Sequence, residues 1–206
     1  MKKPVVLILI LVVIAVGAYF VLSKRNANEN PEQPKQQALL VSKNDETFNK
    51  AFAASLEKYY VLKDAFVEWD STKAGKAAGD LAASVSQIPF GSLKSDTTII
   101  STAKNFADGI VSESKAIQGT PEITEQRHSF YTLSEDFYNL VRTVRYDQAV
   151  IYHVNCPMAF NDEQEAFWIS NTKDVVNPYL GKKHPKYKSG MINCGEVKDS
   201  IDFRHK

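Results

Sequence analysis

The chain has 206 residues, a formal net charge of +1 at pH 7, 44% hydrophobic residues and 24% charged residues. These fractions are those of an ordinary globular protein, and they exclude a chain that is disordered throughout. The nearly balanced charge, with no basic stripe along the sequence, argues against a nucleic-acid partner. The length allows one globular domain together with a membrane segment.

The N-terminal part of the chain carries an apolar run, residues 4–22, without a charged residue and with lysine or arginine on both sides. As a helix it would span roughly 28 Å, which matches the hydrocarbon core of a bilayer, and it has no polar face. We expect a transmembrane signal anchor in a bacterial inner membrane, with residues 1–3 in the cytoplasm and the domain in the periplasm. The alternative is a signal peptide cleaved near Ala18, which would release the domain into the periplasm.

Residues 23–43 are rich in Asn, Gln, Glu and Pro, and they lack apolar periodicity until residue 39. Such a composition predicts a flexible linker whose ends lie on the order of 25 Å apart. The exported domain would therefore comprise residues 44–206 and stand clear of the lipid headgroups.

Four stretches between residues 45 and 145 place apolar residues three or four positions apart, which predicts amphipathic helices. The first covers residues 45–70, with apolar positions at Phe48, Phe52, Leu56, Tyr59, Leu62, Phe66 and Trp69. The second is expected to be capped by Ser71 or Thr72. The third covers residues 96–118, and the fourth runs from Thr120-Pro121 to about Arg145. Four such helices with short connections predict a mainly α protein, an antiparallel four-helix bundle.

The pattern changes after Tyr146. Residues 149–154 are β-branched or aromatic and predict a short strand. Beyond them single apolar residues stand among Asn, Gly, Pro and Lys, so we expect irregular structure with a short helix over 162–168. This C-terminal segment, residues 146–200, needs packing on the bundle, a covalent link or a metal ion to hold it.

Sulfur is concentrated in this segment. It contains both cysteines, Cys156 and Cys194, and the two methionines that follow Met1, namely Met158 and Met191. Residues i and i+2 of an extended chain share a face, and residues three apart are neighbours in a turn. Thiolates and thioethers select Cu(I) over harder ions, whereas thioethers are not usual zinc ligands. The four sulfurs therefore form a candidate copper(I) site, and His153 could join it if a turn brings its side chain to the same face.

A disulfide between Cys156 and Cys194 is the alternative, because an exported compartment is oxidising and the number of cysteines is even. It would close a loop of about 39 residues and contribute at most roughly 4 kcal/mol. Met158 and Met191 would then be core residues that fill gaps. The residues alone leave both readings open, since a reduced pair can bind Cu(I) and an oxidised pair cannot.

An enzyme is not expected. His153 could in principle activate Cys156 as a nucleophile, but no residue is evident that would orient the histidine. The sequence has no C-x-x-C redox motif, no C-x-x-C-H haem attachment, no phosphate loop and no G-x-S-x-G motif.

Several short motifs occur in order along the chain. They are Tyr60–Val67, Gln126–Phe130, Leu133–Glu135, Cys156-Pro157-Met158-Ala159-Phe160, Phe167-Trp168-Ile169-Ser170, Asn177-Pro178-Tyr179-x-Gly181 and Met191-x-x-Cys194-Gly195. With them the chain, from residue 45 to about 197, resembles a bacterial periplasmic domain of unknown function. That domain occurs alone behind an export or anchor segment, and also at the C-terminus of adaptor subunits of Cus-type copper and silver efflux systems. The chain departs from the pattern by an apparent insertion over residues 182–190.

The resemblance implies a copper-associated module in the periplasm, with copper or silver efflux components as partners, and it supports Cys156, Met158, Met191 and Cys194 as ligands. The leading hypothesis is therefore a membrane-tethered periplasmic domain that binds Cu(I) or Ag(I) in envelope copper handling or efflux. The alternative hypothesis is a non-enzymatic interaction domain stapled by a Cys156–Cys194 disulfide.

Overall fold

The computed structural model describes residues 43–204. The predictions for residues 1–42, which comprise the cytoplasmic tail, the anchor and nearly all of the linker, lie outside the described residues. Within 43–204 no helix combines the length and the apolar character that a membrane span requires.

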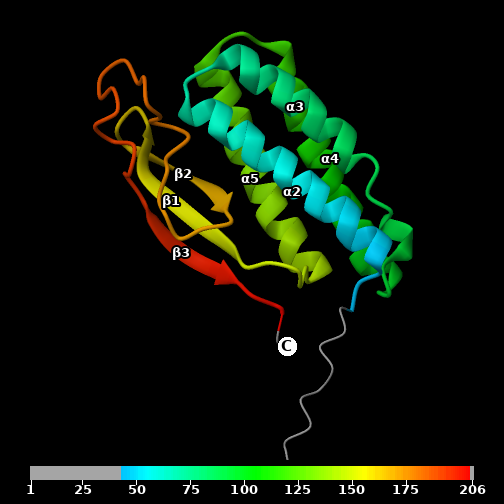
Figure 1. The fold of residues 1–206 in the computed structure, drawn as a ribbon. Coiled ribbons are helices and arrows are strands. Elements are labelled where there is room, and N and C mark those ends of the chain that lie inside the picture. Colours follow the sequence, from blue (N-terminus) through cyan, green and yellow to red (C-terminus); the bar gives the residue numbers. More distant parts are fainter. Residues whose placement is uncertain (1–42, 205–206) are drawn as a thin grey trace, which may run out of the picture. The chain divides into compact units, whose positions relative to one another are not determined.

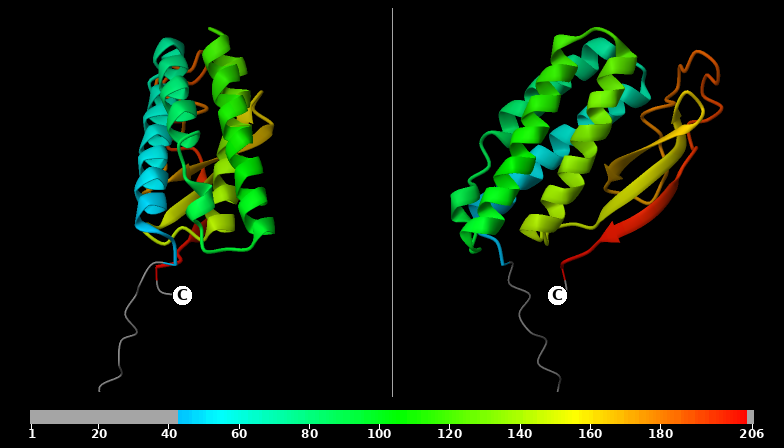
Figure 2. Two further views of the ribbon diagram at one scale, coloured as in Figure 1. Left: turned by 90° about the vertical axis from the view of Figure 1, so that its right-hand side faces the viewer. Right: turned by 180° about the vertical axis from the view of Figure 1, so that it is seen from behind.

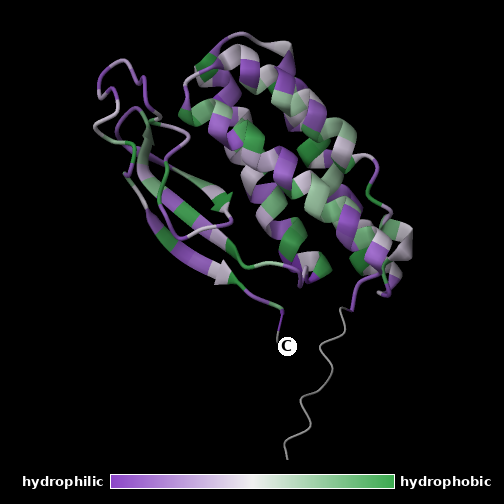
Figure 3. Ribbon diagram, viewed as in Figure 1, coloured by the Kyte–Doolittle hydropathy of each residue, from purple (hydrophilic) through white to green (hydrophobic). Residues whose placement is uncertain are grey.

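Four long helices form the larger part of the domain. They are α2 (Glu46–Val67), α3 (Ser71–Val85), α4 (Thr97–Gly119) and α5 (Ile123–Val144), with a short 3-10 helix η1 (Phe90–Ser92) between α3 and α4. Consecutive helices run in opposite directions (Figure 1). The predicted mainly α fold with four helices is thus confirmed. Hydrophilic positions recur along the length of each helix (Figure 3), as expected for helices with one buried face.

Aspartates begin three of these helices. Asp45, Asp70 and Asp96 each accept a hydrogen bond from a backbone N–H of the first turn, with distances of 2.8, 2.9 and 2.9 Å. The prediction that Ser71 or Thr72 caps the second helix was wrong, because Asp70 provides the cap. A carboxylate at this position also interacts favourably with the positive end of the helix dipole.

The helix predicted from Thr120-Pro121 begins slightly later, at Ile123. The first helix ends before Trp69, which adopts a positive φ of 60° and so lies beyond α2.

Aromatic side chains fill the space between α2 and α5. The ring of Tyr59 lies 5.4 Å from that of Phe130 and 5.3 Å from that of Phe137, measured between centroids. Phe66 lies 4.9 Å from Phe130. In contrast, α3 presents small buried residues such as Ala74 to its neighbours. Large side chains therefore lie between α2 and α5, on the side of the bundle where the sheet is attached.

The C-terminal part contains more regular structure than expected. It forms a three-stranded antiparallel sheet in the order β2-β1-β3, made of β1 (Ile151–Phe160), β2 (Gln164–Ser170) and β3 (Glu196–Ile201). The predicted short helix over 162–168 was wrong. Asn161 and Asp162 both have positive φ, 53° and 66°, and turn the chain into a hairpin. These residue types tolerate that conformation, and pairing with β1 then fixes residues 164–170 as a strand.

The two faces of this sheet have different surroundings. Val154 pairs with Trp168 and Cys156 pairs with Ala166, so these residues share one face, which the loop of residues 171–195 covers. His153 and Asn155 point to the opposite face, where the ring of Tyr138 from α5 stacks on His153. The sheet lies to one side of the bundle, with the loop beside it (Figure 2). Both faces are thus buried in part by other elements of the domain.

Two tyrosine hydroxyls close the outer edge of β2. Tyr59 on α2 accepts a hydrogen bond from Ile169 N at 3.0 Å and is itself 2.8 Å from Ser134 Oγ on α5. Tyr179 from the loop donates to the carbonyl oxygen of Phe167. An unpaired strand edge is otherwise open to another chain. Here the edge joins the sheet to the bundle.

Asp136 on α5 sits against the backbone of α4. A Cβ added at Gly109 would lie 2.2 Å from Asp136 Oδ2, so the carboxyl occupies the space that glycine leaves. Burial raises the pKa of Asp136 to about 6, with smaller contributions from Glu113 and Glu135. The charged carboxylate is therefore disfavoured in the folded state.

Replacing Tyr59 by phenylalanine should lower the free energy of unfolding by about 1–3 kcal/mol, because Ile169 N–H and Ser134 lose a buried partner. Chemical unfolding followed by circular dichroism measures the change. Tyr131→Phe, at a half-buried tyrosine of α5, is the control and should change stability little. Equal stability of the Tyr59 variant and the wild type would contradict the prediction.

The stability of the wild type should fall as the pH rises from about 4 to about 6, because the folded state holds the Asp136 proton more tightly than the unfolded state. Asp136→Asn should remove this part of the pH dependence and make the domain more stable than the wild type at neutral pH. Thermal unfolding at a series of pH values tests this, with Asp108→Asn at an exposed position of α4 as the control. A parallel pH dependence in wild type and Asp136→Asn would refute it.

Candidate functional site

The structure brings the two cysteines together. Cys156 Sγ on β1 lies 3.6 Å from Cys194 Sγ in the loop, and both thiols are free. Cys156 is fully buried, whereas Cys194 is half-buried. A disulfide requires about 2.05 Å between the sulfurs, so the pair would have to close by about 1.5 Å to form one. The arrangement is a dithiol with one inner and one outer sulfur.

The Cys156 thiol is held in its protonated form. Burial raises its pKa to about 11, although hydrogen bonds from the Met158 backbone and the Asn177 side chain act in the opposite direction. A thiol nucleophile requires the opposite shift, because the thiolate is the reactive species.

Asn177 fixes the loop beside Cys194. Its Nδ2 donates to Cys194 O at 2.7 Å, and its Oδ1 accepts from the backbone N–H groups of Tyr179 and Leu180 at 2.8 and 2.9 Å. Its own backbone N donates to Ile192 O at 2.8 Å. Asn177 is fully buried, so these bonds join the two ends of the loop without competition from water.

Arg127 fastens the same loop to the bundle. This α5 residue is only 3% exposed, and its guanidinium donates to Pro178 O at 3.0 Å and to Phe66 O at 3.2 Å. The guanidinium also lies 3.4 Å from the ring centroid of Trp69. Burial lowers its pKa to about 9. Carbonyl dipoles and an aromatic face thus compensate this buried charge, and within residues 43–204 Arg127 forms no salt bridge.

Two glycines permit the close approach of the loop. Gly195 has φ +136°, and a Cβ there would lie 2.6 Å from Asn155 O of β1. Gly181 has φ +49°, and a Cβ there would lie 2.9 Å from Val67 O at the end of α2. Because both positions combine left-handed backbone with contact to another backbone, only glycine fits them without strain.

The predicted methionine ligands lie next to the cysteines in the chain. Met158 lies two residues after Cys156 on β1, and Met191 O accepts a hydrogen bond from Cys194 N at 3.0 Å. Both methionines are half-buried and pack against the core.

His153 is not brought to the sulfurs. Strand β1 continues without the turn that would have placed it there, so His153 and Cys156 point to opposite faces of the sheet. His153 Nε2 lies 2.7 Å from Glu135 Oε1, and its ring stacks between Tyr138 and Phe167 at 3.9 and 4.7 Å. In the part of the chain that the structure describes, no group of three or more His, Cys, Asp or Glu side chains could hold a metal ion.

Sequence reasoning named Arg127, Trp69 and Tyr59 only within a motif or a helix pattern and missed their supporting contacts, because the partners are distant in the chain. Asn177 was noted within a motif, but its contact with Cys194 was not foreseen.

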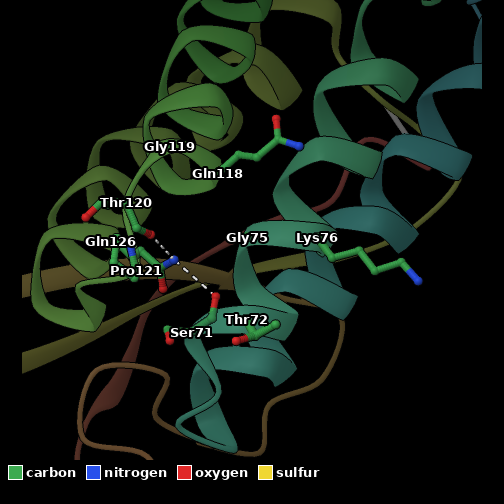
Figure 4. A pocket seen from close by; sticks show the side chains of 9 residues that line it. All are labelled: Ser71, Thr72, Gly75, Lys76, Gln118, Gly119, Thr120, Pro121 and Gln126. Carbon is green, nitrogen blue, oxygen red and sulfur yellow. Dashed lines mark hydrogen bonds between the residues drawn. The ribbon is translucent and has the colours of Figure 1, made fainter.

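A separate surface pocket of about 370 Å³ lies where α3 begins and α4 passes into α5 (Figure 4). The Gln126 side chain, 1% exposed, donates to Ser71 O at 3.1 Å and to Thr120 O at 2.8 Å. None of the pocket's residues belongs to the sulfur site, and its only charged residue is Lys76. The lining consists of Ser71, Thr72, Gly75, Lys76, Gln118, Gly119, Thr120, Pro121 and Gln126.

Comparison with known protein families gives a match. Residues 55–149 match a family described as "Protein of unknown function (DUF3347)". No curated protein and no solved structure matches the chain. The matched residues extend from the middle of α2 to just beyond α5 and end before β1, so both cysteines lie outside them.

Proposed function

We propose that this domain is a non-enzymatic module that binds Cu(I) or Ag(I) through the thiolates of Cys156 and Cys194 at the cell envelope. The observation that supports it is the 3.6 Å separation of two free sulfurs supplied by segments 38 residues apart. Met158 and Met191, each close to one cysteine in the chain, are the proposed thioether neighbours.

The spacing of the sulfurs suits a shared ion. With metal–sulfur bonds of about 2.3 Å, as in zinc thiolates, two sulfurs 3.6 Å apart subtend roughly 100° at the ion. The pair can therefore accept one ion with only small movements. Soft sulfur donors favour a soft monovalent ion over Mg²⁺ or Ca²⁺, which prefer oxygen. Binding would release protons, because the thiolate is the ligand.

The proposed location at the cell envelope is based on the amino-acid sequence. The apolar residues 4–22 favour a membrane tether, and the resemblance to a domain of copper and silver efflux adaptors favours a role next to an efflux system. In that setting the module would take up the ion from the periplasm and hold it close to its partner.

A second candidate function is a disulfide-stapled interaction domain. The same short distance between the sulfurs favours it, since a closure of about 1.5 Å would form the bond. In this case the disulfide would hold the loop on β1, and the partner would bind elsewhere.

The reduced full-length chain, purified anaerobically in detergent, should bind one Cu(I) per chain in competition with a chromogenic chelator. Cys156→Ser and Cys194→Ser should each weaken binding at least a hundredfold, because each removes one of two thiolates. Met158→Leu and Met191→Leu should weaken it about tenfold or less. His184→Gln, a histidine in the same loop, is the control. Undiminished one-to-one binding of Cu(I) by Cys156→Ser would contradict the proposed function.

Thiol counting separates the two candidates. The chain has only two cysteines, so protein alkylated in intact cells before lysis should carry two modified thiols if the pair is a metal site. If the pair instead forms a disulfide, no modified thiol is expected. A disulfide also predicts that Cys194→Ser loses roughly 4 kcal/mol of stability without a reductant, because the closed loop is about 39 residues long. A loss of this size, together with unmodified cysteines, would favour the staple.

A further inference from the structure

The position of Cys194 depends on a residue that carries no sulfur. Cys194 lies outside the strands, in the irregular loop, whereas Cys156 is held within β1. The bond from Asn177 Nδ2 to Cys194 O at 2.7 Å is the side-chain contact that holds this part of the loop. Gly195, packed on Asn155, limits it from the other side.

The side-chain amide of Asn177 is bound at both its nitrogen and its oxygen. A side-chain amide has two N–H donors. One of them donates to Cys194 O, and Cys194 Sγ lies 3.6 Å from Cys156 Sγ. Its oxygen is occupied by the N–H groups of Tyr179 and Leu180, which fixes the orientation of the amide.

We propose that Asn177 is the positioning residue of the cysteine pair, whose amide sets the separation of the two sulfurs and thereby both the soft-metal affinity and the dithiol–disulfide equilibrium of the pair. The metal part of this inference rests on the proposed function, and the redox part stands without it. In the redox step glutathione disulfide accepts two electrons from the dithiol. A sulfur–sulfur bond forms between Cys156 and Cys194, and the two thiol protons end on two glutathione thiols.

Asn177→Asp is the sharpest test. A carboxylate has nearly the same shape and keeps the acceptors for Tyr179 and Leu180, but it cannot donate to Cys194 O. Asn193→Asp introduces the same charge at an exposed position next to Cys194 and is the matched control. Both variants are compared with the wild type as full-length chains in detergent.

With Asn177→Asp the loop loosens and the effective concentration of one thiol at the other falls. We expect the equilibrium constant for disulfide formation in glutathione buffers to fall about tenfold, which corresponds to about 30 mV. Cu(I) affinity should fall by a similar factor, while Asn193→Asp remains within twofold of the wild type. A residue that served only loop stability would lower the unfolding temperature and leave both equilibria unchanged, and that outcome would overturn the proposal.

A second measurement uses the wild type and does not depend on the folding of a variant. The side-chain amide signals of ¹⁵N-labelled asparagine should shift for Asn177 when the pair is oxidised, and again when reduced protein receives Cu(I). The signals of Asn193 serve as the reference. Unchanged Asn177 signals on oxidation would also overturn the proposal. A wild type that shows the redox shift but binds no Cu(I) would instead reject the proposed function and retain the role of Asn177.

Discussion

The arrangement of the domain depends on the hydrogen bonds made to the backbone groups at the outer edge of β2. A three-stranded sheet attached to a helical bundle has a strand edge whose N–H and C=O groups need partners. Tyr59 and Tyr179 supply those partners to Ile169 and Phe167, one from α2 and one from the loop. Because both tyrosines are fully buried, their hydroxyl groups cannot exchange these bonds for water. This contact therefore determines where the sheet lies relative to the bundle, and hence where β1 presents Cys156.

The loop over the other face of the sheet is placed by polar contacts of the same kind. Arg127 and Asn177 lie in surroundings where an unpaired polar group would cost several kcal/mol, and both direct their donors to backbone carbonyls of the loop or of α2. Such bonds hold an irregular segment that has no strand or helix of its own to satisfy its backbone groups. These contacts hold the loop that places Cys194 beside Cys156.

The functional proposal follows from this geometry and from the chemistry of sulfur. The family match covers the helices, while the sulfur pair belongs to the sheet and the loop. A half-buried Cys194 beside a fully buried Cys156 provides one accessible donor and one shielded donor, an arrangement suited to receiving a soft ion from solvent. His153 is not near the sulfurs. Glu135 and two aromatic rings hold it on the face of the sheet toward α5.

The sequence by itself determined the four helices and most of their core, because residues such as Phe48, Phe52 and Phe66 repeat with the period of a helix and that period is a local property. It also indicated that sulfur gathers near the C-terminal end. It did not determine β2, because the segment 162–168 was expected to form a short helix and becomes a strand only through its pairing with β1. Only the tertiary structure decided that Cys156 and Cys194 meet, that His153 turns away, and that Arg127 and Asn177 hold the loop. These outcomes depend on partners between 17 and 61 residues apart in the chain, and no local periodicity records such contacts.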